Sequence, residues 1–455
     1  MPGAILSSSE PEHTGTGEEP RIIIIGGGPT GLGAALRLHE LGYRNWTVYE
    51  KEDEAGGLSG STVDEKGFTW DYGGHILFSG FSRINAILDG LGDDFFIDHE
   101  RKSYVRIMGR FIPFPFQLHT DHLPHECRQE IKRDAATDGR LKDPPENFRQ
   151  WLENRFGPAQ CRLFFYPYNS KLWGAPLESM SWSWVRERIS TPDQVKKGRS
   201  WGPNNRFRYP ARGGMGGLFK RLAAKFPMRV RYGSEIKEID ITAKKITCGN
   251  GVTDAFDFLV SSMPLNTLVG QALSEAPETI RRHAAELRWN SCRITGLGFE
   301  TPVENHVSWA YFPESFFPFY RVTALASYSP DIVPGADISA FSSFMCETTA
   351  RDGKAADKRL FHDAVSASGM SRRKLPHPLS FHTIFLPYAY PVPTLERDRH
   401  LAAIQEFLES RDIYSRGRFG GWKYEAGNMD HSMMQGMEAI DRILLGRREE
   451  VYRTG

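Results

Sequence analysis

An uninterrupted apolar run, Ile22–Ile25, leads into a glycine-rich segment, and small and apolar residues with helical spacing follow it. A short apolar run bounded by glycines predicts a strand buried on both faces, and the residues after the glycines predict a helix. A second apolar run, 46–49, ends at Glu50. This order of strand, turn, helix and strand predicts a βαβ unit near the N-terminus.

Other patterns divide the rest of the chain. Alternating residues on both sides of Met108–Gly109 predict a hairpin with a two-residue turn. From 118 to about 200 the pattern becomes helical, and Asn147 is placed to cap a helix whose apolar face includes Phe148 and Phe156. Short alternating runs between 290 and 390 predict an antiparallel sheet, and a last helix is expected over 430–445.

The glycine-rich segment has the spacing of a dinucleotide-binding turn. Gly26 permits a tight bend, Gly28 lets the backbone approach a pyrophosphate, and Gly31 lets the helix pack closely on the strand. The helix N-terminus then faces the phosphates, and Glu50 is placed to bind a ribose hydroxyl. Only one GxGxxG turn occurs in the sequence, so we expect one bound FAD and no separate NAD(P)H domain.

Two further glycine pairs, Gly56–Gly57 and Gly73–Gly74, indicate a backbone wrapped around a large cofactor. We therefore predict an α/β fold: an FAD-binding Rossmann-like domain with an inserted helical domain and an antiparallel β-sheet domain. The expected boundaries are a disordered tail at 1–20, the FAD-binding domain at 21–100, 205–285 and 412–450, the helical substrate domain with mobile loops at 118–204, and the sheet domain at 101–117 and 286–411.

Composition excludes several classes of function. With 57 Lys and Arg against 56 Asp and Glu, no overall charge attracts nucleic acid or an anionic membrane. No run of about 18 apolar residues is present, and the first twenty residues lack the apolar segment of a signal peptide. Five scattered cysteines without CxxC spacing argue against a disulfide framework or a zinc site. We expect a cytoplasmic protein with no metal, no nucleic-acid partner and no membrane partner.

Candidate chemistry elsewhere depends on arginines among aromatic residues. Arg188 and Arg321 come from different segments, and two guanidinium groups can clamp a diphosphate. For either arginine alone, a stacked or salt-bridged structural role is the more common alternative. The start of the last helix, after Asn428, can stabilise a negative charge such as that of a reduced flavin, or it can be an ordinary capped helix.

Long stretches of the chain resemble the UDP-galactopyranose mutase family, more its longer eukaryotic members than its shorter bacterial ones. The resemblance extends from about Ile22 to Leu445. It is carried by the stretches at 26–35, 73–79, 167–173, 201–204, 209–214, 390–397 and 417–428.

The resemblance implies roles for the matching residues. In the catalytic set, Arg188 and Arg321 hold the substrate diphosphate and His75 lies on a loop against the flavin. The implied nucleotide-sugar pocket comprises Phe78, Phe114, Gln117, Asn169, Trp173, Asn204, Tyr311, Tyr328, Tyr390, Arg418, Tyr424 and Asn428. The implied cofactor contacts are Gly26, Gly28, Thr30, Gly31, Glu50, Gly57, Leu58, Gly74, His75, Ile236, Asn428, Met429 and Ser432.

Two positions depart from the eukaryotic pattern. Phe114 stands where those enzymes have a tyrosine beside the uracil, so stacking is kept and a hydroxyl is lost. Met429 stands where they have a glutamine next to the flavin. The chain is also shorter than those relatives, which leaves its oligomeric state open, a homo-oligomer included.

The resemblance implies an isomerase that interconverts UDP-galactopyranose and UDP-galactofuranose. In that chemistry the sugar anomeric carbon forms a covalent adduct with N5 of reduced FAD, UDP leaves, and the ring opens and recloses through another oxygen. FAD acts in its reduced form, and NAD(P)H is the reductant. The alternatives are the same chemistry on another nucleotide hexose, an amine-oxidase-like FAD oxidoreductase, and a nucleotide-sugar sensor without catalysis.

Overall fold

The glycine-rich turn follows the central strand of a five-stranded parallel sheet, at the carboxyl end of that strand. The structure is a computed structural model, and it describes residues 19–136, 144–187, 189, 206–350, 352–354 and 356–454. All four strand pairs are parallel. The sheet order is β19 (Ile413–Ser415), β13 (Phe258–Ser261), β1 (Ile22–Ile25), β2 (Trp46–Tyr49) and β9 (Val230–Arg231). The predicted βαβ unit is therefore confirmed, with α1 (Pro29–Glu40) as its helix.

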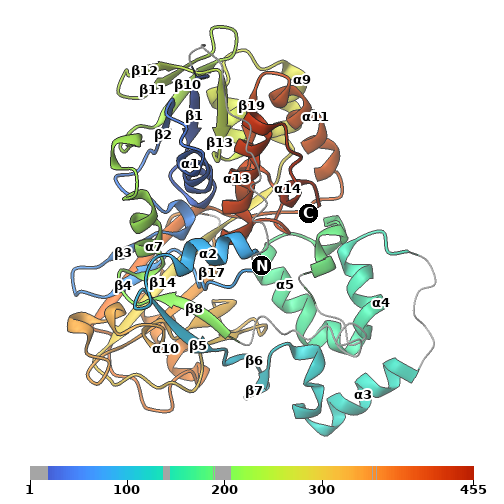
Figure 1. The fold of residues 1–455 in the computed structure, drawn as a ribbon. Helices are drawn as coiled ribbons and strands as arrows, with labels where there is room; N and C mark the ends of the chain where they lie inside the picture. Colours follow the sequence, from blue (N-terminus) through green and yellow to red (C-terminus); the bar gives the residue numbers. More distant parts are fainter. Residues whose placement is uncertain are drawn as a thin grey trace, which may run out of the picture.

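Helix α1 packs directly on the last long helix, α13 (Met429–Leu445), and Figure 1 shows the two close together beside the parallel sheet. A Cβ atom at Gly33 would lie 2.2 Å from the carbonyl oxygen of Met433, and one at Gly436 would lie 2.0 Å from that of Thr30. Each helix thus has a glycine where the backbone of the other approaches. This contact places the start of α13 near the glycine-rich turn.

A seven-stranded sheet forms a second layer. Its order is β18 (Ser380–Pro391), β14 (Trp289–Phe299), β17 (Ser342–Ala350), β16 (Arg321–Thr323), β15 (Trp309–Tyr311), β6 (Ser103–Ile107) and β7 (Arg110–Pro113). Every pair is antiparallel except β15 with β6. The predicted hairpin is β6–β7, and its turn residues Met108 and Gly109 have φ of 47° and 76°, as a type I′ turn requires.

Three small sheets and several helices complete the two layers. The small sheets are β10 (Ile236–Asp240), β11 (Lys245–Cys248) and β12 (Thr253–Ala255); β3 (Ser61–Val63) and β4 (Thr69–Asp71); and β5 (Phe96–Glu100) and β8 (Arg206–Pro210). The helices are α2 (Ser82–Asp89), α7 (Gly214–Ala223), α8 (Leu265–Thr267), α9 (Glu278–Ala285), α10 (Lys358–Ser368), α11 (Arg397–Glu409), α12 (Gly417–Gly420) and α14 (Val451–Thr454).

The helical region comprises α3 (His125–Ala136), α4 (Phe148–Gln160), a π-helical turn (Cys161–Phe165) and α5 (Tyr166–Trp173). Figure 1 shows it as a separate lobe beside the seven-stranded sheet. The Asn147 side chain accepts a hydrogen bond from the Gln150 N–H at 3.0 Å, so the predicted cap is confirmed. Phe148 and Phe156 are buried, as the helical spacing predicts.

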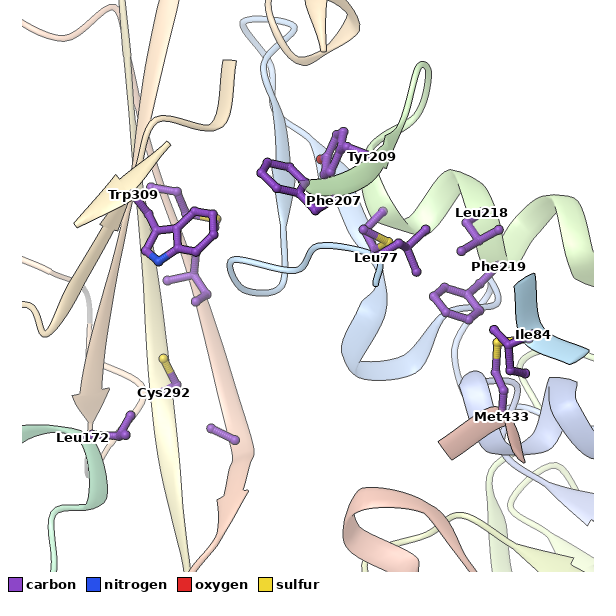
Figure 2. Close-up of a cluster of buried hydrophobic side chains, with 14 of the residues drawn as sticks. Leu77, Ile84, Leu172, Phe207, Tyr209, Leu218, Phe219, Cys292, Trp309 and Met433 are labelled. Carbon is purple, nitrogen blue, oxygen red and sulfur yellow. The ribbon is translucent and has the colours of Figure 1, made fainter. Parts of the chain in front are cut away.

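The largest buried apolar cluster is continuous across these regions. It includes Met433 of α13, Ile84 of α2, Trp309 of β15 and Leu172 of α5, several of which Figure 2 shows. A second cluster covers the other face of the parallel sheet and contains Leu401 of α11, a helix that the sequence analysis places with the antiparallel sheet. Within the described residues, no helix combines the length and apolar character that a membrane span requires.

Candidate active site

The glycine-rich turn leaves room for a dinucleotide at the start of α1. Gly26 has φ of 101°, and a Cβ atom at Gly31 would lie only 1.8 Å from the carbonyl oxygen of Gly26. Gly28 is the N-cap of α1, no side chain caps this end, and the first turn contains no acidic residue. The positive end of the α1 dipole is therefore open to a pyrophosphate.

Glu50 is a buried carboxylate whose hydrogen-bond donors among the described residues are backbone N–H groups. The N–H groups of Gly27 and Glu52 donate to it at 2.5 Å and 2.9 Å, and the side chain is 4% exposed. Burial raises the pKa of Glu50 above its usual range. No cation among the described residues forms an ion pair with it. A carboxylate fixed in this way beside a dinucleotide turn can accept hydrogen bonds from ribose hydroxyls.

A cavity of about 280 Å³ opens between the start of α13 and the seven-stranded sheet. The predicted site residues that line it are Leu58, Gly74, His75, Phe78, Arg321, Tyr390, Arg418, Tyr424, Asn428 and Met429. The lining residues that the sequence analysis did not select are Tyr72, Gly73, Ile76, Leu77, Cys292, Ile294, Glu347, Leu386, Ala389 and Asp430. The start of α13 also borders the cavity without a side-chain cap from Asn428, but its first turn carries the carboxylate of Asp430.

Glu347 accepts hydrogen bonds from three residues of or next to the cavity wall. Its Oε1 accepts from Nε and Nη2 of Arg321 at 2.6 Å and 2.5 Å and from the Gly74 N–H at 3.0 Å. Its Oε2 accepts from the Tyr320 hydroxyl at 3.1 Å. Burial, the largest single effect, lowers the pKa of Arg321, but the Glu347 carboxylate and the neighbouring tyrosines together raise it above its usual range. One carboxylate thereby fixes both a cation and the Gly73–His75 turn.

His75 lies on that turn as an uncharged ring. Burial lowers the pKa of His75 to about 3, and the positive charges of Arg418 and Arg321 act in the same direction. Its Nδ1 atom is buried and has no hydrogen-bond partner among the described residues. The His75 N–H donates to the Gly73 carbonyl at 2.7 Å, which makes the turn tight. His75 therefore contributes a neutral imidazole at neutral pH.

This pKa predicts how His75 affects stability. The unfolded chain binds a proton at His75 below pH 6.5, whereas the folded chain binds it only near pH 3, so acidification in this window disfavours folding. Burial raises the pKa of Asp71 to about 6, so acidification favours folding through protonation of Asp71. Both wild type and His75→Gln contain Asp71, so comparing the two proteins isolates the contribution of His75. In urea unfolding, we expect wild type to lose about 1 to 2 kcal/mol relative to this variant between pH 7.5 and pH 5. A pH-independent difference would show that folding does not shift the pKa of His75.

Aromatic rings enclose one side of the cavity. Tyr424 contacts Trp173 at a ring-centroid distance of 5.0 Å, Trp184 at 5.4 Å and Tyr390 at 5.7 Å, all edge to face. The Arg418 guanidinium lies 5.5 Å from the centre of the Tyr390 ring, and its Nε donates to the Gly427 carbonyl at 2.8 Å. This wall offers flat faces to a sugar and limits access of water.

A second aromatic group lies around Tyr311. The centroid of its ring is 4.9 Å from that of Phe114. The Arg101 guanidinium carbon lies 5.0 Å from the centroid of the Phe114 ring and 4.9 Å from that of the Trp309 ring. Arg101 also hydrogen-bonds to Tyr311. The predicted residues Gln117, Asn169, Trp173 and Tyr328 are buried, and none of them lines the 280 Å³ cavity.

The remaining predicted residues are distributed as follows. Gly26, Gly28, Thr30, Gly31, Glu50 and Gly57 surround the start of α1, Ser432 is buried on the first turn of α13, and Ile236 begins β10. Arg188 and Asn204 lie outside the described residues.

The sequence analysis missed Glu347 and Arg101. A usable signal for Glu347 was its position as the one charged residue in the otherwise uncharged run 342–350, most of which β17 buries. A charge inside such a strand indicates a partner. Arg101 gives a weaker signal, because it lies just before the β6 strand among other charged residues.

Residues 29–356 match the family of flavin containing amine oxidoreductases. The crystal structure of reduced UDP-galactopyranose mutase is 35% identical, with a TM-score of 0.87 over 95% of this chain and 96% of that one. The chain belongs to the UDP-galactopyranose mutase family. The predicted family and fold class are thereby confirmed, and this member of the mutase family is a flavoprotein.

More distant structures share the fold of this mutase-family protein. A putative protoporphyrinogen oxidase from Exiguobacterium sp. 255-15 is 17% identical, with a TM-score of 0.71 over 94% of this chain and 100% of that one. A putrescine oxidase double mutant is 14% identical, with a TM-score of 0.68 over 94% of this chain and 99% of that one. At these identities the likeness concerns the fold alone.

Proposed function

We propose that the protein interconverts the pyranose and furanose forms of a nucleotide sugar, with UDP-galactopyranose and UDP-galactofuranose as the favoured pair. The observation that carries this proposal is the Glu347 assembly. It fixes Arg321, a cation suited to a diphosphate, beside the Gly73–His75 turn of the flavin site.

The cofactor of this proposal is FAD, and the residues present fit it. Gly28, Gly31 and Gly57 allow close approach of the backbone, Glu50 receives the ribose, and the uncapped start of α1 faces negative charge. When bound and reduced, the flavin supplies a nucleophilic nitrogen for the anomeric carbon of the sugar. NAD(P)H is the proposed reductant.

The protein side chains have separate tasks. Arg321, together with Arg188, binds the diphosphate and stabilises the negative charge that grows on the leaving nucleotide. Phe114 and Tyr311 stack on the base. Tyr390 and Tyr424 face the sugar and exclude water from its anomeric carbon. In this proposal the side chains position the substrate, and formation of the bond to the sugar is assigned to the cofactor.

The test is a product assay with protein in both redox states. Protein reduced with dithionite is incubated with UDP-galactofuranose, and we expect chromatography to show UDP-galactopyranose, whereas oxidised protein gives none. Cyanoborohydride quenching is expected to yield a species with the mass of the flavin plus one hexose. Stoichiometric hydrogen peroxide without a ring isomer would support an oxidase instead. Tight binding without product would support a sensor.

The identity of the base and of the sugar in the substrate is a separate question, and the phenylalanine at position 114 bears on it. Without a hydroxyl at this position, the ring beside the base stacks but offers no hydrogen-bonding group. The alternative substrate is therefore another nucleotide hexose, for example a 6-deoxy sugar on a different base. The same assay with a panel of UDP- and dTDP-hexoses decides between the two by the ratio of kcat/KM values.

A further inference from the structure

Lys171, on α5, makes an unusual set of contacts. Its Nζ donates to the carbonyl oxygens of Phe312, Glu314, Phe317 and Phe319 at 2.7, 3.0, 2.9 and 2.7 Å. An ammonium group has three hydrogens, so at least one of them is shared between two carbonyls. Among the described residues, no carboxylate lies within ion-pair distance of Nζ. Lys171 therefore binds a backbone segment and not an acidic side chain.

The segment that it binds, 312–320, connects β15 to β16. The Phe312 N–H donates to the Tyr320 carbonyl at 2.8 Å. The Tyr320 N–H does not donate to Phe312 in return, because it donates to the Glu347 carbonyl. The rings of Phe312, Phe317 and Phe319 pack on one another with centroids 4.8 to 5.5 Å apart. Buried carbonyls need partners, and Lys171 supplies a partner for four of them.

This contact joins two parts of the site. Tyr311 ends β15 and Arg321 begins β16, so the 312–320 segment links a residue of the proposed base pocket to the proposed diphosphate cation. Helix α5 carries two further predicted pocket residues, Asn169 and Trp173. We propose that Lys171 is a positioning residue that holds the 312–320 segment against α5 and thereby sets Arg321 and Tyr311 for binding of the nucleotide sugar.

Helix α5 is also anchored independently of Lys171. The carbonyl of Leu172 accepts hydrogen bonds from Asn290 Nδ2 at 2.6 Å and from Thr349 Oγ1 at 2.8 Å, which tie the end of α5 to β14 and β17. Removing the Lys171 ammonium group therefore frees the 312–320 segment but leaves the helix in place. The predicted defect is local, in the connection between Tyr311 and Arg321.

The primary test is hydrogen exchange of the 312–320 amides in the flavin-loaded protein. Lys171→Met keeps an unbranched side chain as far as Cε but lacks the ammonium group, and we expect these amides to exchange roughly tenfold faster or more. Lys102→Met is the matched control, because Lys102 Nζ donates to a single carbonyl, that of Asn305, at 2.9 Å. Unchanged exchange in Lys171→Met would overturn the proposal. This measurement does not depend on the proposed function.

The second test, which rests on the proposed function, separates positioning from folding. With reduced Lys171→Met, we expect KM for the nucleotide sugar to rise about tenfold or more while flavin content stays that of wild type. Lys171→Ala lacks three carbons and the ammonium group, so added n-propylammonium should lower its KM and n-propanol should not. Faster exchange with an unchanged KM would overturn the positioning role. Absence of turnover in wild type would instead contradict the proposed function, and exchange would still test the contact.

Discussion

Arg321→Lys is expected to lower kcat/KM for the nucleotide sugar about 10²- to 10³-fold in reduced protein. Lysine keeps the charge but loses the planar fork that donates to Glu347 from Nε and Nη2 and that, in the proposed function, donates to a diphosphate with its remaining N–H groups. The loss should fall on kcat as well as KM, because the leaving nucleotide gains negative charge in the transition state. Steady-state rates measured by chromatography of the two ring forms give both parameters.

The matched control is Arg106→Lys. Arg106 lies on β6 of the same sheet, and its Nε donates to the carbonyl of Ser368, away from the cavity lining. We expect its kcat/KM to stay within about threefold of wild type, as for substitutions outside the site. Equal effects of the two changes would assign the Arg321 result to the sheet in general. An unchanged rate in Arg321→Lys would refute the diphosphate assignment.

Glu347→Gln is expected to lower the free energy of unfolding by about 3 kcal/mol, the low end for breaking a buried ion pair. The low end applies because Arg321 keeps 19% of its side chain exposed, towards the cavity, whereas Glu347 keeps only 2%. The amide oxygen can still accept at the Oε1 position, but it carries no negative charge to compensate the Arg321 guanidinium. Guanidinium chloride unfolding followed by tryptophan fluorescence measures the change.

Tyr320→Phe provides the comparison for Glu347. It removes only the hydroxyl that donates to Glu347 Oε2 at 3.1 Å, so we expect about 1 kcal/mol. Glu347→Gln should also lower turnover, since the Gly74 N–H and Arg321 share one oxygen of Glu347. A stable Glu347→Gln protein with normal turnover would show that Arg321 and the Gly73–His75 turn are fixed by other contacts.

Local features of this fold could be predicted from the sequence because their causes are local. The Met108–Gly109 turn needs two residues with positive φ, and the Asn147 cap needs one side-chain oxygen three residues from its donor. Gly31 is required by a contact within the same βαβ unit, because a Cβ atom there would lie 1.8 Å from the carbonyl oxygen of Gly26. Such signals depend on a few neighbouring positions and survive without knowledge of the rest of the chain.

Contacts between distant segments could not be predicted in this way. Lys171 is ordinary as a helix residue, and its partners are four backbone carbonyls, which no sequence pattern distinguishes. The pairing of Arg321 with Glu347 depends on β16 lying beside β17, and periodicity does not fix strand order. Resemblance to a family identified Arg321, but the carboxylate that orients it required the register of the sheet.

The glycine contact between α1 and α13 has a consequence for how the protein acquires its cofactor. Helix α1 is synthesised long before the start of α13, which includes Asn428. The cavity is lined by Asn428 and Met429, so a nascent chain that has not reached these residues lacks part of the cavity wall. Stable retention of the cofactor is therefore expected only after α13 has been made and has packed on α1.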